Sequence, residues 1–302
     1  MRISPDERDE RSSGRMDGGA APPATRPARP ATIRGRVFFS RDNFVLSIAQ
    51  AACIVLPAAG VPLRLQRFRT GAWALILPLN IAVVVFAIVL IPTTADVLTW
   101  VALVLVPVGC ALALGWAARG ARWWLAPLAA PLLALAWAIP DTYAGQAATT
   151  LLILGSAVTV GRLLAAAAPL LLLKAGVLAM AATDAYLVFS GQLEQPNAVL
   201  VAAAPGLGLP QLQSASFGHA GLGYGDFFAA AVVGGILAAE RAPQLVPALL
   251  MLVVTLAWDQ LFLVYDVLPA TIPPALVLIA VELWRARRRP RPAPAAEPLP
   301  SM

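Results

Sequence analysis

The chain has 302 residues, of which 59% are hydrophobic and 13% charged, and this composition excludes a soluble globular protein. The formal net charge is +6, but the arginines lie in the tails and between apolar runs, so we expect no nucleic-acid partner. Two cysteines without a CxxC spacing, Cys53 and Cys110, and one histidine, His219, offer no metal-binding set. We therefore predict an all-α polytopic membrane protein that needs the lipid bilayer and no metal or cofactor.

Nine apolar runs follow one another, each about as long as a bilayer-spanning helix, which needs roughly 20 residues. Residues 1–41 precede them, are rich in Arg and Pro, and are expected to be disordered. Five spans fall in residues 42–168 and four in residues 169–284, and a basic, Pro-rich tail covers 285–302. The predicted spans are 44–63, 72–91, 97–116, 123–139, 149–168, 169–189, 219–239, 245–265 and 268–284.

The arginines between the runs predict an orientation. They lie at the ends of spans one, three, five, seven and nine, whereas the loops after spans two, four, six and eight contain no Lys or Arg. The positive-inside rule then places the C-terminus in the cytoplasm and the N-terminus outside the cell membrane, although the arginines of the N-terminal tail oppose this. The boundary between spans five and six stays open, because Arg162 and Lys174 are both candidate markers.

Two carboxylates inside apolar runs are the candidate functional groups. A charged side chain in a membrane helix costs about 3 kcal/mol or more, so Asp184 and Asp226 indicate a function. Asp184 lies five residues before the end of span six and Asp226 seven after the start of span seven. Adjacent spans run antiparallel, so both lie roughly 8–10 Å inside the same membrane face. We predict that they form a catalytic pair, with Gly223 and Gly225 allowing another backbone to approach.

Other interpretations of these acids remain open. Asp226 would be structural if it only capped a kinked helix beside Gly225. Asp184 would be structural if it paired with Lys174, but ten residues of helix separate the two by about 15 Å. Asp259 is the rival member of the pair, because it also lies about six residues from the outer end of its span.

Three short stretches occur in order in the last part of the chain. They are Asp184 followed by Val188 and Phe189, then Gly223-Tyr224-Gly225-Asp226, and then Pro274-Ala275-Leu276. This set resembles the GxGD intramembrane aspartyl proteases, the presenilins and signal peptide peptidases, which also have nine spans. Thr183 departs from that family, which usually has an aromatic residue before the first aspartate.

The resemblance implies an activity and a site. Asp184 and Asp226 would activate a water that cleaves a peptide bond within a transmembrane substrate. Gly223, Tyr224 and Gly225, together with Pro274, Ala275 and Leu276, would bind that substrate. A second Pro-Ala-Leu stretch at 247–249 begins span eight near the opposite face, so we expect it to take no part.

The chemistry expected of two neighbouring carboxylates is that one stays protonated while the other takes a proton from water. The protonated one then stabilises the developing oxyanion. Which carboxylate acts as the base is not assigned. The substrate must unwind, and it would add a strand to exposed backbone. Residues 198–201 and the Pro274 region are the candidate edges.

Two alternatives belong to other classes. Prepilin peptidases also carry a Gly-Tyr-Gly-Asp-Phe stretch, but they usually have a Lys where this chain has Phe228, and they cut at the cytoplasmic face. A transporter or channel would use Asp184, Asp226 and Asp259 as a proton or cation relay. The substrate, any partner subunits and the oligomeric state are not indicated by the sequence.

Overall fold

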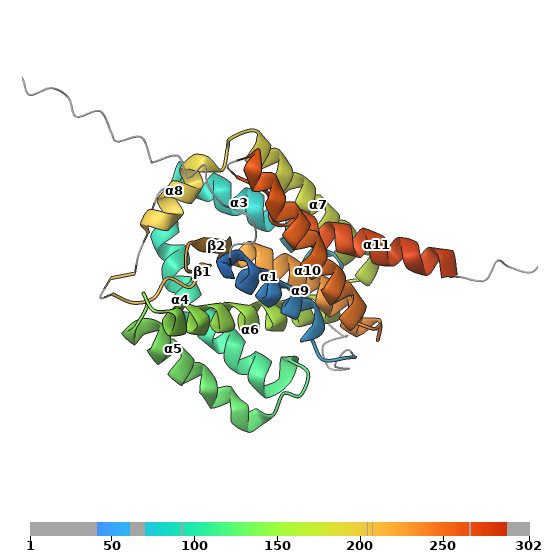
Figure 1. The fold of residues 1–302 in the computed structure, drawn as a ribbon, viewed down its shortest axis with the longest axis horizontal. Helices are drawn as coiled ribbons and strands as arrows, with labels where there is room; N and C mark the ends of the chain where they lie inside the picture. Colours follow the sequence, from blue (N-terminus) through green and yellow to red (C-terminus); the bar gives the residue numbers. More distant parts are fainter. Residues whose placement is uncertain are drawn as a thin grey trace, which may run out of the picture. The chain divides into compact units, whose positions relative to one another are not determined.

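A computed structural model describes residues 41–60, 70–91, 93–203, 205–206, 208–265 and 267–288. The chain divides into two units, residues 1–36 and 37–302, and every described residue belongs to the second. These residues form helices and one two-stranded sheet (Figure 1). The tail predicted to be disordered lies outside the described residues, except for Arg41, which begins the first helix.

Each predicted span overlaps one α-helix, and a tenth α-helix lies in the loop predicted between spans six and seven. The α-helices are α1 (Arg41–Val55), α3 (Ile76–Leu90), α4 (Thr94–Leu112), α5 (Ala129–Ala138), α6 (Tyr143–Ala167), α7 (Leu170–Phe189), α8 (Glu194–Ala202), α9 (Tyr224–Ala239), α10 (Leu245–Asp259) and α11 (Ile272–Arg288). Four short helical turns accompany them: η1 (Gly71–Leu75), η2 (Ala113–Ala117), η3 (Trp123–Leu128) and η4 (Gln260–Leu263). The open boundary between spans five and six falls at Ala168 and Pro169, where α6 ends and α7 begins.

Four helices are long and apolar enough to cross a membrane. They cover Thr94–Ala117, Tyr143–Ala167, Leu170–Phe189 and Leu245–Leu263. A fifth is added if Gly71–Asn80 and Ala82–Leu90, which meet at a 50° bend, form one span. By length and composition these helices indicate an all-α, membrane-embedded protein. The count of nine spans stays a prediction, because the remaining apolar helices are shorter than a full span.

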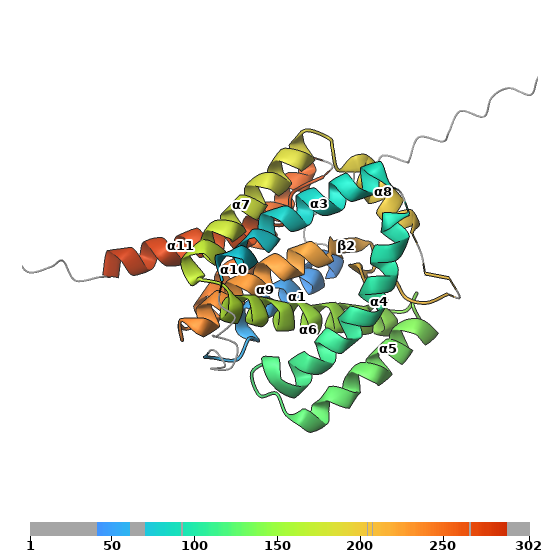
Figure 2. The same cartoon turned by 180° about the vertical axis from the view of Figure 1, so that it is seen from behind.

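Helix α9 lies at the centre of the described unit. All its residues from Phe227 to Ala238 are buried, and it packs against α1, α6, α7 and α11. Figures 1 and 2 show α6 and α1 running along it. Helices in lipid gain little from the hydrophobic effect and associate through close packing, which explains why half of the buried residues of α9 are Ala or Gly.

Glycines bring α6 and α9 into backbone contact. A Cβ atom built on Gly161 would lie 2.3 Å from the carbonyl oxygen of Ala231, and one on Gly235 would lie 2.4 Å from that of Gly161. On the side facing α1, a Cβ atom on Gly234 would lie 2.4 Å from the carbonyl oxygen of Cys53. Any side chain at these positions would force the helices apart, so the glycines determine how closely the core packs.

A hairpin precedes α9 where the sequence analysis expected helix from His219 onward. Strands β1 (Ser214–Phe217) and β2 (Ala220–Gly223) pair antiparallel, and the turn between them has Gly218 at φ +58°. Gly218 N–H donates to Gln146 Oε1 at 2.8 Å, and His219 N–H donates to Asp42 Oδ2 at 3.0 Å. The prediction was wrong here because the two glycines of β2 weaken any helix and the turn is held by distant side chains.

The connection between α7 and α9 contains a second departure. Residues 198–201, expected to offer an extended edge to a substrate, lie in helix α8. The backbone groups of a helix interior are already hydrogen-bonded, so this edge is not available. The hairpin is the only paired extended backbone among the residues that the structure describes, apart from an isolated bridge between Pro57 and Ala118.

Four charged side chains join the ends of α7, α9 and α11. Lys174 Nζ lies 2.6 Å from Glu240 Oε1 and 2.9 Å from Glu282 Oε1, and Arg285 pairs with the same two acids. Burial raises the pKa of Glu240, but its ion pairs with both cations outweigh burial and hold that pKa below its ordinary value. Lys174 is therefore engaged here and not with Asp184. Arg285 lies within α11, which continues to Arg288, so the predicted tail begins as helix.

Candidate active site

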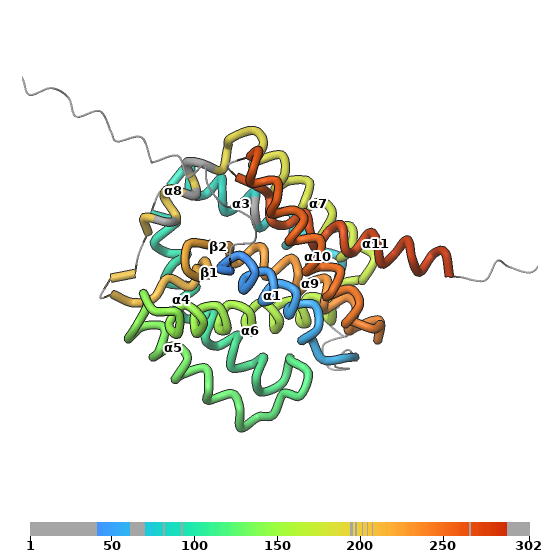
Figure 3. The backbone as a smooth tube through the Cα atoms, viewed as in Figure 1, coloured from blue at the N-terminus to red at the C-terminus, as the bar shows by residue number. Residues whose placement is uncertain are grey.

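Asp226 lies in the first turn of α9. Its Oδ2 accepts a hydrogen bond of 3.1 Å from the N–H of Gly223, the residue that ends β2 and precedes the helix. An acidic side chain at this position satisfies one of the free N–H groups of the turn and faces the positive end of the helix dipole. Figure 3 traces the chain from β2 directly into α9. Asp226 as a whole residue is half-buried.

Asp184 lies on α7 and is 9% exposed. The hydroxyl of Thr271 donates a hydrogen bond of 2.6 Å to its Oδ2, and the backbone N–H of Thr271 donates to the same carboxylate. Thr271 directly precedes α11. The carboxylate of Asp184 is therefore oriented by the start of the last helix.

The structure brings the two predicted aspartates together. Helix α7 packs against α9, and the carboxylates of Asp184 and Asp226 lie close enough to interact electrostatically. The rival, Asp259, ends α10 and hydrogen-bonds the hydroxyl of Ser47 in α1. This arrangement favours Asp184 and Asp226 as the pair.

The Pro-Ala-Leu stretch of the last span lies in the first turn of α11, a few residues after Thr271. Pro274 and Ala275 are buried, whereas Leu276 is 42% exposed. Proline is tolerated in a first turn because the N–H that it lacks would have no intrahelical partner. The second copy, residues 247–249, begins α10 just after the end of α9, so it lies at the opposite end of α9 from Asp226, as expected.

The residues before Asp226 have separate environments. The hydroxyl of Tyr224 lies 3.0 Å from that of Ser156 in α6, which fixes the first residue of α9 to the neighbouring helix. A Cβ atom built on Gly225 would have no atom within 4 Å. The sequence analysis expected another backbone beside this glycine, and among the described residues none lies there.

Two further residues, Thr271 and Gln50, belong to this site and were not predicted from the sequence. Gln50 in α1 is 1% exposed, and its Nε2 lies 3.3 Å from the backbone oxygen of Asp226 and 3.4 Å from that of Ala270. Its Oε1 accepts a hydrogen bond of 3.4 Å from Thr255 in α10. A signal for Gln50 was present, since a lone amide in an apolar run must find partners when it is buried. No such signal marked Thr271.

The polar groups of the site are two carboxylates together with the hydroxyl, amide and backbone groups that hydrogen-bond to the two aspartates. Within the described ranges, no three His, Cys, Asp or Glu side chains gather where they could hold a metal ion. Two interacting carboxylates can bind a water and exchange protons with it.

Comparisons with protein families, curated proteins and solved structures found no match to this chain.

Proposed function

We propose that this protein is an intramembrane aspartyl protease in which Asp184 and Asp226 activate a water to hydrolyse a peptide bond within a transmembrane substrate. The observation that carries the proposal is the electrostatic interaction between two carboxylates on neighbouring apolar helices. Acids in apolar helices are costly, so two that interact electrostatically indicate a chemical role.

The two acids have different roles in the proposed mechanism. One carboxylate is ionised and takes a proton from the water, which attacks the scissile carbonyl. The other is protonated and stabilises the oxyanion, then protonates the leaving amine. Asp184 and Asp226 are both held by hydrogen bonds, to Thr271 and Gly223, so little reorganisation is needed during the reaction.

The hairpin supports the supply of water and the binding of the substrate. Non-helical backbone at membrane depth is tolerated only where it is buried in protein or lines a water-filled cavity. Strand β2 ends at Gly223, three residues before Asp226, so an extended substrate paired with it would pass the carboxylates. In this proposal Gly223, Tyr224 and Gly225 line one side of the substrate cleft.

The last helix lines the other side of that cleft, through Pro274, Ala275 and Leu276. We propose that all nine apolar helices are embedded, and that the shorter ones, such as α9, end at the cavity and not at the membrane surface. At about 1.5 Å per residue, α9 is roughly 24 Å long, less than the ~30 Å of the hydrocarbon core.

Cleavage of a tagged transmembrane peptide in proteoliposomes is the direct test. We expect the purified protein to cut inside the apolar stretch, and mass spectrometry of the products locates the bond. Gly225→Ala fills the open space without a clash in the chain, so it should leave the thermal unfolding midpoint unchanged or raise it. It should lower cleavage about tenfold or more, because a small displacement of the substrate is costly. Full activity in this variant would show that the substrate does not pass Gly225.

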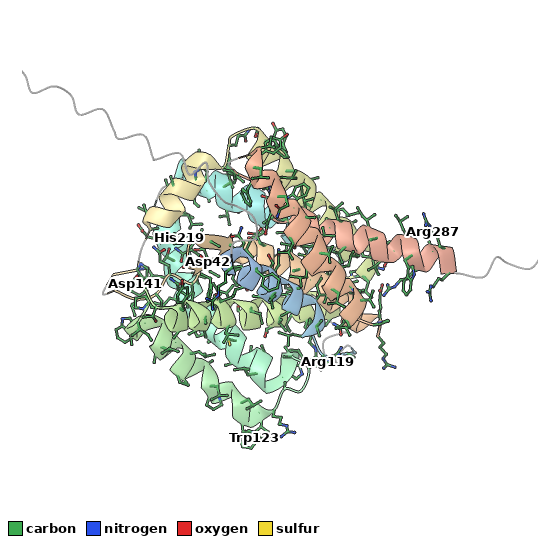
Figure 4. All side chains as sticks on the ribbon, viewed as in Figure 1. Asp42, Arg119, Trp123, Asp141, His219 and Arg287 are labelled. Carbon is green, nitrogen blue, oxygen red and sulfur yellow. The ribbon has the colours of Figure 1, made fainter. Side chains whose placement is uncertain are left out.

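The orientation is a further part of the proposal: the N-terminus outside the cell membrane and the C-terminus in the cytoplasm. Asp141 and His219 lie toward one side of the helices in Figure 4, and Arg119 and Arg287 toward the other. We expect a membrane-impermeant thiol reagent to label Gln192→Cys in intact cells and to spare Arg287→Cys until the cells are opened. Both positions are exposed, and the native cysteines are buried. The reverse pattern would favour a prepilin-peptidase-like enzyme that cuts at the cytoplasmic face.

A further inference from the structure

A chain of hydrogen bonds connects the two aspartates through residues outside the GxGD and Pro-Ala-Leu stretches. It begins at the carboxylate of Asp184, which accepts from the hydroxyl of Thr271 at 2.6 Å. Thr271 is covalently joined to Ala270, whose carbonyl accepts from Gln50 Nε2 at 3.4 Å. The same nitrogen donates to the carbonyl of Asp226 at 3.3 Å.

Gln50 is suited to this bridging position. Its amide nitrogen carries two hydrogens, one for each carbonyl, and its amide oxygen accepts from Thr255 in α10. The side chain is 1% exposed, so water does not replace these partners. A buried amide with every group paired is held in one orientation, and it transmits that orientation to the groups that it binds.

We propose that Thr271 and Gln50 are positioning residues that hold Asp184 and Asp226 in the geometry needed to share one water. This inference rests on the proposed function. It adds α1 and the turn before α11 to the catalytic unit, whereas the family resemblance implied only spans six, seven and nine. Without the bridge, α7 and α9 still pack, but the first turn of α9 and the turn before α11 are no longer joined through Gln50.

Activity measurements test the role of the Thr271 hydroxyl. Thr271→Val keeps the shape of the side chain and removes the hydroxyl, so kcat should fall roughly ten- to a hundredfold with KM unchanged. Thr271→Ser should restore most of the rate, because it keeps the hydroxyl. Thr159→Val is the matched control: Thr159 is also buried and donates to a neighbouring helix, at Gly109, but lies outside the chain of bonds.

The same logic applies to Gln50. Gln50→Leu replaces the amide by an apolar side chain of similar size, and kcat should fall about tenfold. Gln50→Glu keeps the length and the acceptor of the side chain but loses the two donated hydrogen bonds, so it should not restore the rate. Wild-type kcat in Thr271→Val or Gln50→Leu would overturn the proposal, as would an equal loss in Thr159→Val.

A measurement that does not depend on catalysis distinguishes this inference from the proposed function. In a double-mutant cycle of Thr271→Val and Asp184→Ala, the shifts in thermal unfolding midpoint should be non-additive, because the two side chains share a hydrogen bond. Additive shifts would overturn the inference even if the protein is a protease. An absence of proteolysis in the wild-type protein would instead reject the proposed function, and with it the catalytic part of this inference.

Discussion

Replacing Asp184 or Asp226 by alanine is expected to abolish cleavage of a transmembrane peptide while the protein still folds and inserts. Neither carboxylate can do both the base and the acid step alone, so the rate in each variant should fall about a thousandfold or more. The fold should survive, because removing an acid from an apolar surrounding relieves a desolvation cost. Product formation followed by mass spectrometry, together with elution from a sizing column, measures both outcomes.

Asp259→Ala is the matched control for these variants. Asp259 is also an acid in an apolar helix, but it bonds Ser47 of α1. We expect this variant to keep most of its activity. If it were inactive while Asp184→Ala retained turnover, the pair would have to be reassigned to Asp226 and Asp259.

Replacing Gly161 by valine is expected to lower the stability of the protein strongly. A Cβ atom there would lie 2.3 Å from the backbone oxygen of Ala231. The three nearest atoms all belong to the backbone of α9, so no side-chain movement can make room. The close approach of α6 and α9 would be lost, at a cost of about 3 kcal/mol or more. The thermal unfolding midpoint in detergent should drop sharply, and much of the protein should aggregate on purification.

Gly206→Val tests whether the loss comes from the contact or from the glycine itself. A Cβ atom on Gly206 would meet nothing within 4 Å, so this variant should unfold near the wild-type temperature. Similar losses in both variants would contradict the interpretation that the α6–α9 contact determines the packing of the core.

The sequence predicts the helices well where apolar runs end in recognisable breakers. Pro169, for example, precedes α7 in the structure. The start of α6 was placed too late, at 149, because its first turn is polar; Thr142 caps that turn by accepting from the N–H of Gly145 at 3.2 Å. The pairing of Asp184 with Asp226 was predicted from their depth in the membrane, which depends only on residue counts, and the contact between α7 and α9 agrees with it.

The parts of the site that were missed depend on contacts between distant residues. Thr271 and Asp184 are 87 positions apart, and Gln50 and Asp226 are 176 apart. No local pattern carries such information, since each residue is ordinary for its own segment. The hairpin was missed for the same reason, because its turn is held by Asp42 and Gln146 from other helices.

The direct connection between β2 and α9 also suggests a way to inhibit the proposed proteolysis. The backbone N–H of Tyr224 donates to the carbonyl of Gln213 at 2.9 Å, so the strand pairing extends into the first residue of the helix. Only Tyr224 and Gly225 then separate the hairpin from Asp226. A peptide that pairs with β2 and carries no scissile bond would therefore displace the first turn of α9, which holds the carboxylate of Asp226. Under the proposed function, such a compound would compete with the substrate and would also distort the turn that holds Asp226.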